Sequence, residues 1–339
     1  MIKINIDEIS KSKIEEKIWE DANFNDTGLV QVLKTVKVKS ILINRHKKIY
    51  DILYDPATGD INIVEVKKLL LADRETLKRY IDILGDYSTK KILADELLDN
   101  VFRYDRYSKR KNAVEILKKM QVTVCPYCNR QYIFTLSSGE VRPQFDHYYP
   151  KSRYPYLALS LYNMIPSCSI CNMAKSALDT LKEPILYPFD EEMGSKAKFE
   201  IKRKKNGNFV RMLQGISNEF EITLNAVNAE NKLIISNQME KLHLNDLYNE
   251  HKEYVMDIIK SKYVNSPERI HELLVLFPSL FESYEDVKNL LYMTNIQKAA
   301  WGDRPLSKLT HDIDKQLEEG SIEEGIQCRY PVPDPGKKQ

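Results

Sequence analysis

Four of the five cysteines stand in two Cys-x-x-Cys pairs, a spacing that is typical of a metal site. Cys125-Pro-Tyr-Cys128 and Cys168-Ser-Ile-Cys171 are separated by 39 residues, and each pair can supply two thiolates to one tetrahedral Zn²⁺. A thioredoxin-like redox pair would not need a second copy, and four unrelated buried thiols would rarely fall at this spacing. Four protein ligands leave no open position for a substrate, so the sequence predicts a structural zinc ion.

Asp, His, Asn and Lys residues that could take part in catalysis lie between the cysteine pairs and just after the second pair. They occur in Phe145-Asp146-His147-Tyr148-Tyr149-Pro150-Lys151-Ser152, in Leu161-Tyr162-Asn163, and in Cys171-Asn172-Met173-Ala174-Lys175. Together these motifs resemble the HNH endonuclease superfamily, whose ββα-metal core carries an Asp-His pair, a middle Asn and a third His or Asn. The resemblance covers roughly residues 120 to 180 and implies an endonuclease core.

These residue types also suit phosphodiester hydrolysis on physical grounds. The reaction needs a nucleophilic water, a base, and positive charge beside the phosphate. His147 suits the base, because an imidazole titrates near neutral pH, although a lone histidine is more commonly a packed residue. Asp146 and Asn172 could supply two oxygens to Mg²⁺, which commonly takes only one or two protein ligands; Mn²⁺ is the alternative. Because Asp146 and His147 are adjacent, we expect both at a strand end.

The resemblance assigns roles to further residues of the same segment. Asn163 corresponds to the middle Asn that fastens the loop around the catalytic histidine. Asn172 stands where many HNH proteins have a histidine, and we expect it to begin a helix directly after the second cysteine pair. Lys175, about one turn later, is either a phosphate contact or a solvated surface lysine.

A basic cluster follows this segment and is a candidate for binding nucleic acid. It is centred on Asn206-Gly207, a dipeptide that favours a type I′ turn, so we predict a basic β-hairpin. Phosphate contact and plain solvation of an edge strand are equally good interpretations of its basic residues. These are Lys196, Lys198, Lys202, Arg203, Lys204, Lys205 and Arg211.

One competing nuclease pattern lies near the N-terminus. Asp55 or Asp60, followed by Glu65-Val66-Lys67 on an expected strand, is similar to the Asp…Glu-x-Lys arrangement of restriction-type nucleases. The pattern is short and common by chance, so a solvated strand end is the favoured interpretation.

The resemblance implies a ββα-metal core, and together with the expected helices and strands and the zinc site of four cysteines it predicts an α+β fold. We expect an α/β region over 1–115, including a hairpin that joins 48–54 to 61–67, then a nuclease core over 116–190. A basic hairpin and a helical region over 191–330 follow, with a disordered tail over 331–339. Predicted helices cover 75–84, 109–120 and 245–263, and others begin at Ser266-Pro267 and Ser283; the last ends at Gly320.

Composition limits the setting of the protein. The 339 residues carry a net charge of +2, and no stretch approaches the ~18 uninterrupted apolar residues of a membrane span. The first residues alternate apolar and polar side chains and do not form a secretory signal, so we expect a cytoplasmic protein with no membrane partner.

The sequence therefore predicts an Mg²⁺-dependent endonuclease that cleaves DNA. RNA is an alternative substrate, because the mechanism does not require a 2′-hydroxyl. A noncatalytic zinc module that binds nucleic acid or protein is the alternative from another class. Proteins that resemble this subset often belong to bacterial defence against phage, sometimes beside an ATPase partner, and the resemblance implies the same here.

Overall fold

Helices and two small antiparallel sheets form the structure, so the predicted mixture of helix and sheet is confirmed. The computed structural model describes residues 2–205 and 207–319. Residues 3–127 and 131–191 form a first unit, and residues 128–130 with those from 192 onward form a second. Within the described residues, no helix combines the length and apolar composition that a membrane span requires.

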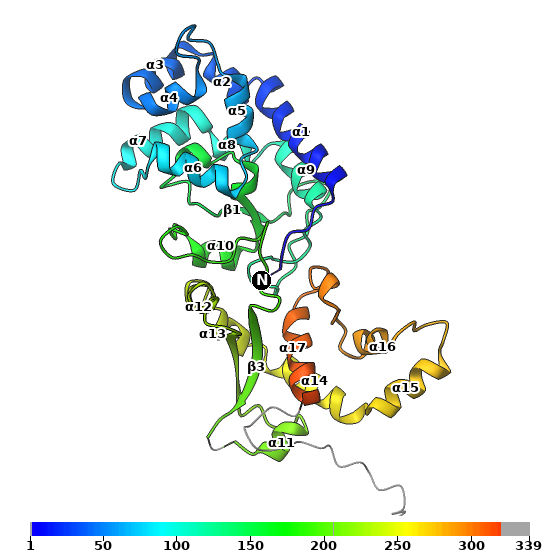
Figure 1. The fold of residues 1–339 in the computed structure, drawn as a ribbon. Helices are drawn as coiled ribbons and strands as arrows, with labels where there is room; N and C mark the ends of the chain where they lie inside the picture. Colours follow the sequence, from blue (N-terminus) through cyan, green and yellow to red (C-terminus); the bar gives the residue numbers. More distant parts are fainter. Residues whose placement is uncertain (1, 206, 320–339) are drawn as a thin grey trace, which may run out of the picture. The chain divides into compact units, whose positions relative to one another are not determined.

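The first unit begins with a run of helices, drawn from blue to cyan in Figure 1. Polar side chains start several of them by accepting a backbone N–H three residues later, as Asp7, Thr35, Asn62 and Asp73 do. The helices are α1 Glu8–Phe24, α2 Leu29–Leu33, α3 Val36–Arg45, α4 Lys47–Leu53, α5 Ile63–Leu70, α6 Arg74–Leu84, α7 Lys91–Glu96, the π-helix η1 Leu97–Phe102, α8 Tyr104–Tyr107 and α9 Lys111–Met120.

The prediction of an α/β region over residues 1–115 is wrong, because its described part holds helices and only an isolated bridge between Tyr54 and Ile61. The segments expected as a hairpin are α4 and α5. In α5 the buried residues Val66, Leu69 and Leu70 follow helical spacing. Glu65 therefore lies on a helix, where it accepts a hydrogen bond from Tyr80 and pairs with Lys68, and the competing nuclease pattern does not form.

Two strands and a helix follow in chain order. Strand β1 (Gln144–His147) pairs antiparallel with β2 (Met164–Ser167), so that Asp146 lies opposite Ile165 and His147 opposite Met164. The 3₁₀ turns η2 (Pro155–Leu157) and η3 (Leu161–Asn163) lie in the connection between the strands. Helix α10 (Ser169–Lys175) packs against β1. All four residues of β2 are buried, which fixes the sheet in the core of the unit.

The second unit has its own sheet, formed by β3 (Ala197–Arg203) and β4 (Phe220–Ala226). Alternate residues of β3 are buried, and α17 (Ser307–Glu319) lies against this strand. Two α17 side chains satisfy its backbone: Asp312 accepts from Phe199 N at 2.8 Å, and Gln316 bonds both backbone groups of Ile201. The other helices are α11 Phe209–Leu213, α12 Lys232–Lys241, α13 Leu244–Asn249, α14 Lys252–Val264, α15 Pro267–Leu276, α16 Tyr284–Leu291 and η4 Lys298–Ala300.

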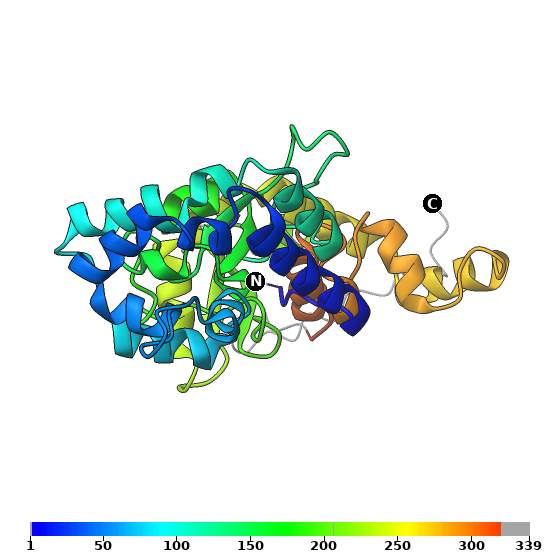
Figure 2. The ribbon, with the colours of Figure 1, turned by 90° about the horizontal axis from the view of Figure 1, so that it is seen from above.

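Helices α15 and α16 lie side by side and project from the rest of their unit (Figure 2). Both begin where the sequence predicts. Ser266 accepts from Arg269 N before Pro267, and Ser283 forms a reciprocal capping box with Asp286. They share a small core of Ile270, Phe281 and Val287.

Two expectations for the second unit need correction, and a third is not tested. The type I′ hairpin is wrong, because β3 pairs with β4, and α11 lies in the long connection between them; Asn206 itself lies outside the described residues. The helix expected over 245–263 is two helices, α13 and α14, that meet at Glu250 and His251. The expected helix end at Gly320 and the tail from 331, like Cys328, lie outside the described residues.

Candidate active site and metal centre

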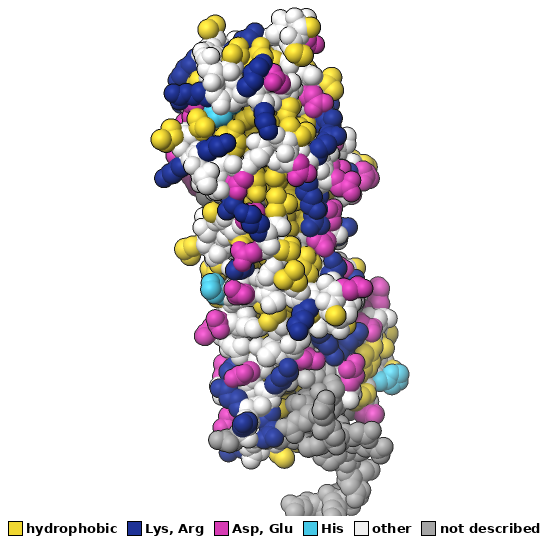
Figure 3. Space-filling model, turned by 60° about the vertical axis from the view of Figure 1, so that its left-hand side comes forward, with side chains coloured by type: hydrophobic (Ala, Val, Ile, Leu, Met, Phe, Trp, Pro, Cys, Tyr) yellow, Lys and Arg dark blue, Asp and Glu magenta, His cyan; other side chains and the backbone are white. Residues whose placement is uncertain are grey.

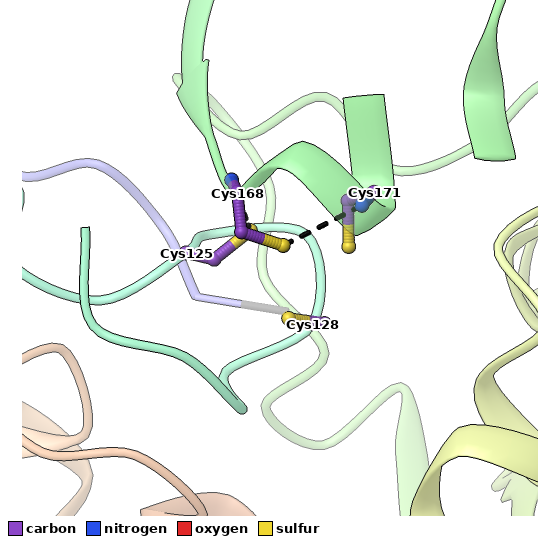
Figure 4. Close-up of side chains that lie close together, drawn as sticks. All are labelled: Cys125, Cys128, Cys168 and Cys171. Carbon is purple, nitrogen blue, oxygen red and sulfur yellow. Dashed lines mark hydrogen bonds between the residues drawn. The ribbon is translucent and has the colours of Figure 1, made fainter. Parts of the chain in front are cut away.

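The four paired cysteines meet at one point. All are buried, and their sulfur atoms lie within 4.8 Å of one another (Figure 4). A tetrahedron with metal–sulfur bonds of about 2.3 Å has edges of about 3.8 Å, so the cluster is close to that size. The four residues could therefore hold a metal ion such as zinc, as the spacing of the two pairs predicts.

Backbone N–H groups point at these sulfurs. Cys168 N donates to Cys125 Sγ, and Cys171 N donates to Cys168 Sγ, each at 3.4 Å. Arg130 N approaches Cys128 Sγ at the same distance. Such donors stabilise the thiolate form of cysteine, which is the form that binds a metal. Cys168 also caps α10, so the start of this helix and the cysteine cluster depend on the same residue.

Asn129, which directly follows the first cysteine pair, fixes the backbone there. It adopts a left-handed conformation (φ 52°), which asparagine tolerates better than most residues. Its side chain accepts from Lys308 N at 3.1 Å and donates to Trp301 O at 2.9 Å, and Tyr248 donates to Cys128 O. No motif of the sequence predicts this role for Asn129, although an asparagine directly after a cysteine pair is a usable signal.

A pocket of about 620 Å³ opens beside β1 in the first unit. Three of the predicted catalytic or magnesium-binding residues line it: Asp146, His147 and Asn172. The other polar and charged residues of the lining come from α8, from β1, and from the segments next to α8, β1 and α10, namely Tyr104, Ser108, Glu140, Arg142, Gln144, Lys151, Ser152 and Ser176. Lys151 and Ser152 belong to the motif that begins at Phe145, whereas no motif predicts the others.

His147 is the last residue of β1, at the strand end where we expect it. Its Nε2 lies 2.9 Å from Ala158 O. A carbonyl oxygen can only accept, so Nε2 carries the proton and Nδ1 carries the lone pair. Tyr104 packs edge-on against the imidazole, with 4.4 Å between ring centroids. Burial lowers the pKa of His147 to about 3, so the ring is neutral at physiological pH, with its lone pair on Nδ1.

Asp146 is held by two buried donors. Tyr127 donates its hydroxyl to Oδ2 at 2.7 Å, and Lys175 Nζ lies 3.0 and 3.2 Å from the two carboxylate oxygens. Burial, reinforced by the Asp146 charge, raises the pKa of Tyr127 well above its ordinary value, so this hydroxyl remains a donor.

Lys175 is only 1% exposed, so its interpretation as a solvated surface lysine is wrong. Besides Asp146, its ammonium binds His147 O at 2.6 Å, and the residue is not among those that line the pocket. It therefore lies behind the Asp-His pair, with its charge directed at the carboxylate.

Asn163 is fully buried and fastens the loop between β1 and β2. Its Oδ1 accepts from Tyr149 N at 2.8 Å, and its Nδ2 donates to Tyr149 O at 3.0 Å and Leu157 O at 3.1 Å. Leu157 is next to Ala158, whose carbonyl accepts from His147. The geometry thus connects Asn163 to the backbone that orients the imidazole.

Asn172 lies on α10 and lines the pocket, where its Nδ2 donates to Gln144 Oε1 at 2.6 Å. The helix begins at Ser169, three residues before the expected start, because Cys168 is the capping residue. The Asn172 amide is nonetheless presented by the first turns of α10, on the helix that packs against β1.

The basic candidates Lys202–Lys205 belong to the second unit and are not among the pocket-lining residues. Lys202, Lys204 and Lys205 are exposed, whereas Arg203 is partly buried and donates to Gly207 O at 2.9 Å.

A stretch of 72 residues is 35% identical to the Septu protein PtuB of Bacillus thuringiensis. The match covers 21% of this chain and 26% of that protein, so it spans about a quarter of the relative. No protein-family model matches the chain, and no solved structure does. The chain is therefore a partial relative of a Septu protein.

Proposed function

We propose that this protein is a metal-dependent endonuclease that hydrolyses phosphodiester bonds in DNA as part of bacterial defence against phage. One observation carries the proposal. His147 is neutral, its Nδ1 lone pair is set by the hydrogen bond from Nε2 to Ala158 O, and it lines a pocket together with Asp146 and Asn172. The chain order β1, β2, α10 supports it further, because it agrees with the ββα arrangement that the resemblance implies.

In this proposal Nδ1 of His147 takes a proton from the attacking water. A pKa of about 3 belongs to the buried ring without substrate. A phosphodiester in the pocket adds negative charge beside the imidazole, which favours the protonated ring and raises its pKa toward the range of an effective base. Tyr104 and the loop tied by Asn163 restrict the ring to one orientation.

Asp146 and Asn172 would hold the catalytic Mg²⁺, with Mn²⁺ as the alternative. Carboxylate and amide oxygens are the hard ligands that these ions prefer, and both residues line the pocket that contains His147. The ion would stabilise negative charge on the phosphate and on the departing oxygen. Zinc at the four cysteines would be structural, because four thiolates complete its coordination.

The similarity to a Septu protein suggests the defence role. Such a setting also suggests an ATPase partner that restrains or activates the nuclease. DNA is the proposed substrate, and RNA enters the test as the competing polymer.

The test is a cleavage assay of purified, zinc-loaded protein on supercoiled plasmid and on total cellular RNA, with Mg²⁺, Mn²⁺ or EDTA. We expect plasmid nicking that requires the added metal and is lost in His147→Ala and Asp146→Asn. His271→Ala, which alters an exposed histidine on α15, is the matched control and should cleave normally. Cleavage that persists in His147→Ala would refute the assigned base. DNA binding without hydrolysis under every metal condition would favour the noncatalytic module.

A further inference from the structure

Two cations border the pocket around Tyr104. Lys151 Nζ lies 4.3 Å from the centre of the Tyr104 ring, and Arg142 is close enough for its charge to counteract the effect of burial on the tyrosine hydroxyl. Both residues line the pocket, and Tyr104 packs on His147. The two positive charges are therefore next to the proposed base.

Both cations are available to an anion. Across residues 2–205 and 207–319, Arg142 forms no ion pair. Lys151 pairs with Asp105 at 3.0 Å, but the Asp105 side chain is 82% exposed, so solvent screens this pair and a ligand can replace it at little cost. Lys175 is not available in this way, because its side chain is buried and its charge is neutralised by Asp146.

The basic surface continues along the segment that carries Tyr104. Residues 103–111 read Arg-Tyr-Asp-Arg-Tyr-Ser-Lys-Arg-Lys, with five cations and one acid. Arg110 is engaged by Asp21 and Thr27, whereas Arg106 and Lys109 are exposed. Burial and the like charges of Arg106 and Arg110 lower the pKa of Arg103, so the cations here repel one another and an anion would relieve that repulsion.

This concentration of charge is local. On the face drawn in Figure 3, Lys and Arg side chains are interspersed with Asp and Glu, and the chain as a whole carries only +2. A phosphate backbone is held by clustered cations and not by net charge.

We propose that Arg142 and Lys151 bind the phosphates next to the scissile bond, and that Arg106 and Lys109 hold the adjoining nucleic-acid backbone. The inference rests on the proposed function for its ligand class. The substrate path then extends from Arg142 and Lys151 over α8 and the connection from α8 to α9, beyond the 120–180 segment. In this proposal these four residues, and not Lys175 or Lys202–Lys205, are the principal phosphate contacts.

The test is equilibrium binding of a fluorescent duplex to zinc-loaded His147→Ala protein, measured by anisotropy from about 50 to 200 mM salt. Arg142→Gln and Lys151→Gln should each weaken binding by about 3- to 10-fold and reduce the slope of log K against log salt by about 0.9, the value for one lost phosphate contact. Arg106→Gln with Lys109→Gln should act in the same direction. Asp105→Asn should strengthen binding, because it removes the anion that competes for Lys151.

Lys37→Gln, at an exposed lysine on α3, is the matched control, and Arg142→Lys should restore binding. Unchanged affinity in the Arg142 and Lys151 variants, with binding lost when Lys202, Lys204 and Lys205 are all changed to Gln, would overturn the inference. Cleavage by the wild type with Mg²⁺ is scored separately. If the Gln variants bind more weakly but the wild type does not cleave, the assignment of this surface to nucleic-acid binding stands and the proposed nuclease activity is refuted.

Discussion

The Asp146 carboxylate occupies an unusual environment for a group that would coordinate Mg²⁺. Its oxygens are held by Tyr127 and Lys175, and Asp146 itself is 3% exposed. The lysine keeps the carboxylate in one orientation, and it also balances a charge that burial alone would strongly disfavour. A surface lysine would do neither, so the position of Lys175 predicts a stability effect that a phosphate contact would not have.

Lys175→Met should lower the free energy of unfolding by about 3–5 kcal/mol, because it leaves the Asp146 charge buried without its counterion. Adding Asp146→Asn should recover part of the loss, since the second change removes that charge. Urea unfolding of the two single variants and the double variant measures the coupling. A lysine that only contacts substrate would leave the unfolding midpoint unchanged, and additive effects of the two changes would exclude the buried pair.

At the scale of elements, local signals were sufficient where capping residues and apolar spacing agreed. Ser266-Pro267 and Ser283 predict the starts of α15 and α16, and the helix expected over 109–120 is α9. The prediction of a hairpin over 48–67 was wrong because it rested on the turn-rich residues 55–60 between two apolar stretches, whereas tertiary packing buries Val66, Leu69 and Leu70 along one helix face. The strand that pairs with β3 could not be predicted from neighbouring residues, because β4 begins only after α11.

Asn163 connects the loop after β1 to the orientation of His147, so its loss should affect both folding and chemistry. Asn163→Ala leaves Tyr149 N, Tyr149 O and Leu157 O without their buried partner, at a cost of about 1–3 kcal/mol for each group that finds no other. We expect a lower melting temperature and a lower kcat for plasmid nicking, with KM less affected. Normal nicking by the folded variant would contradict the link between this loop and the histidine.

His46 lies at the corner between α3 and α4, where its Nδ1 contacts Tyr87, in the segment before α7, and its Nε2 contacts Glu96 of α7. Burial lowers its pKa below 6.5, aided by Arg45 and opposed by Glu96. Between the lowered value and 6.5 the unfolded chain binds a proton that the folded chain does not, so stability falls as the pH drops below 6.5.

His46→Gln should therefore reduce the loss of stability between about pH 8 and about pH 5.5, measured as the shift in urea midpoint. Part of the loss of stability should remain in this variant, because burial also lowers the pKa values of His147, His251 and His311. His271→Gln, at an exposed position, should behave like the wild type. An equal or steeper pH dependence in His46→Gln would contradict the assignment.

At the scale of the whole molecule, the candidate site was predictable to the extent that its residues lie in short motifs. Asp146, His147 and Asn172 do line one pocket, and the four cysteines do meet. Tyr104 and Arg142 were not predictable, because no motif contains them and only the tertiary fold brings them to the pocket. Asn129 acts through the backbone of residues far along the chain, such as Trp301 and Lys308, which spacing alone cannot reveal.

The cysteine cluster brings together segments that are distant in the sequence, so a metal ion bound there should stabilise the fold. Protein purified without chelator should contain one zinc per chain. Cys171→Ser should lose it, whereas Cys328→Ser should retain it, since Cys328 stands outside the two pairs. Removal of a structural zinc ion lowers the free energy of unfolding by several kcal/mol. In a domain of 150–250 residues, about 1 kcal/mol corresponds to a change of about 2–4 °C in Tm. Chelation should therefore lower Tm by about 10 °C. Mg²⁺ should not reverse that loss, because thiolates prefer softer ions. Metal analysis and thermal unfolding measure these effects, and a chelated protein that keeps its Tm would refute a structural zinc.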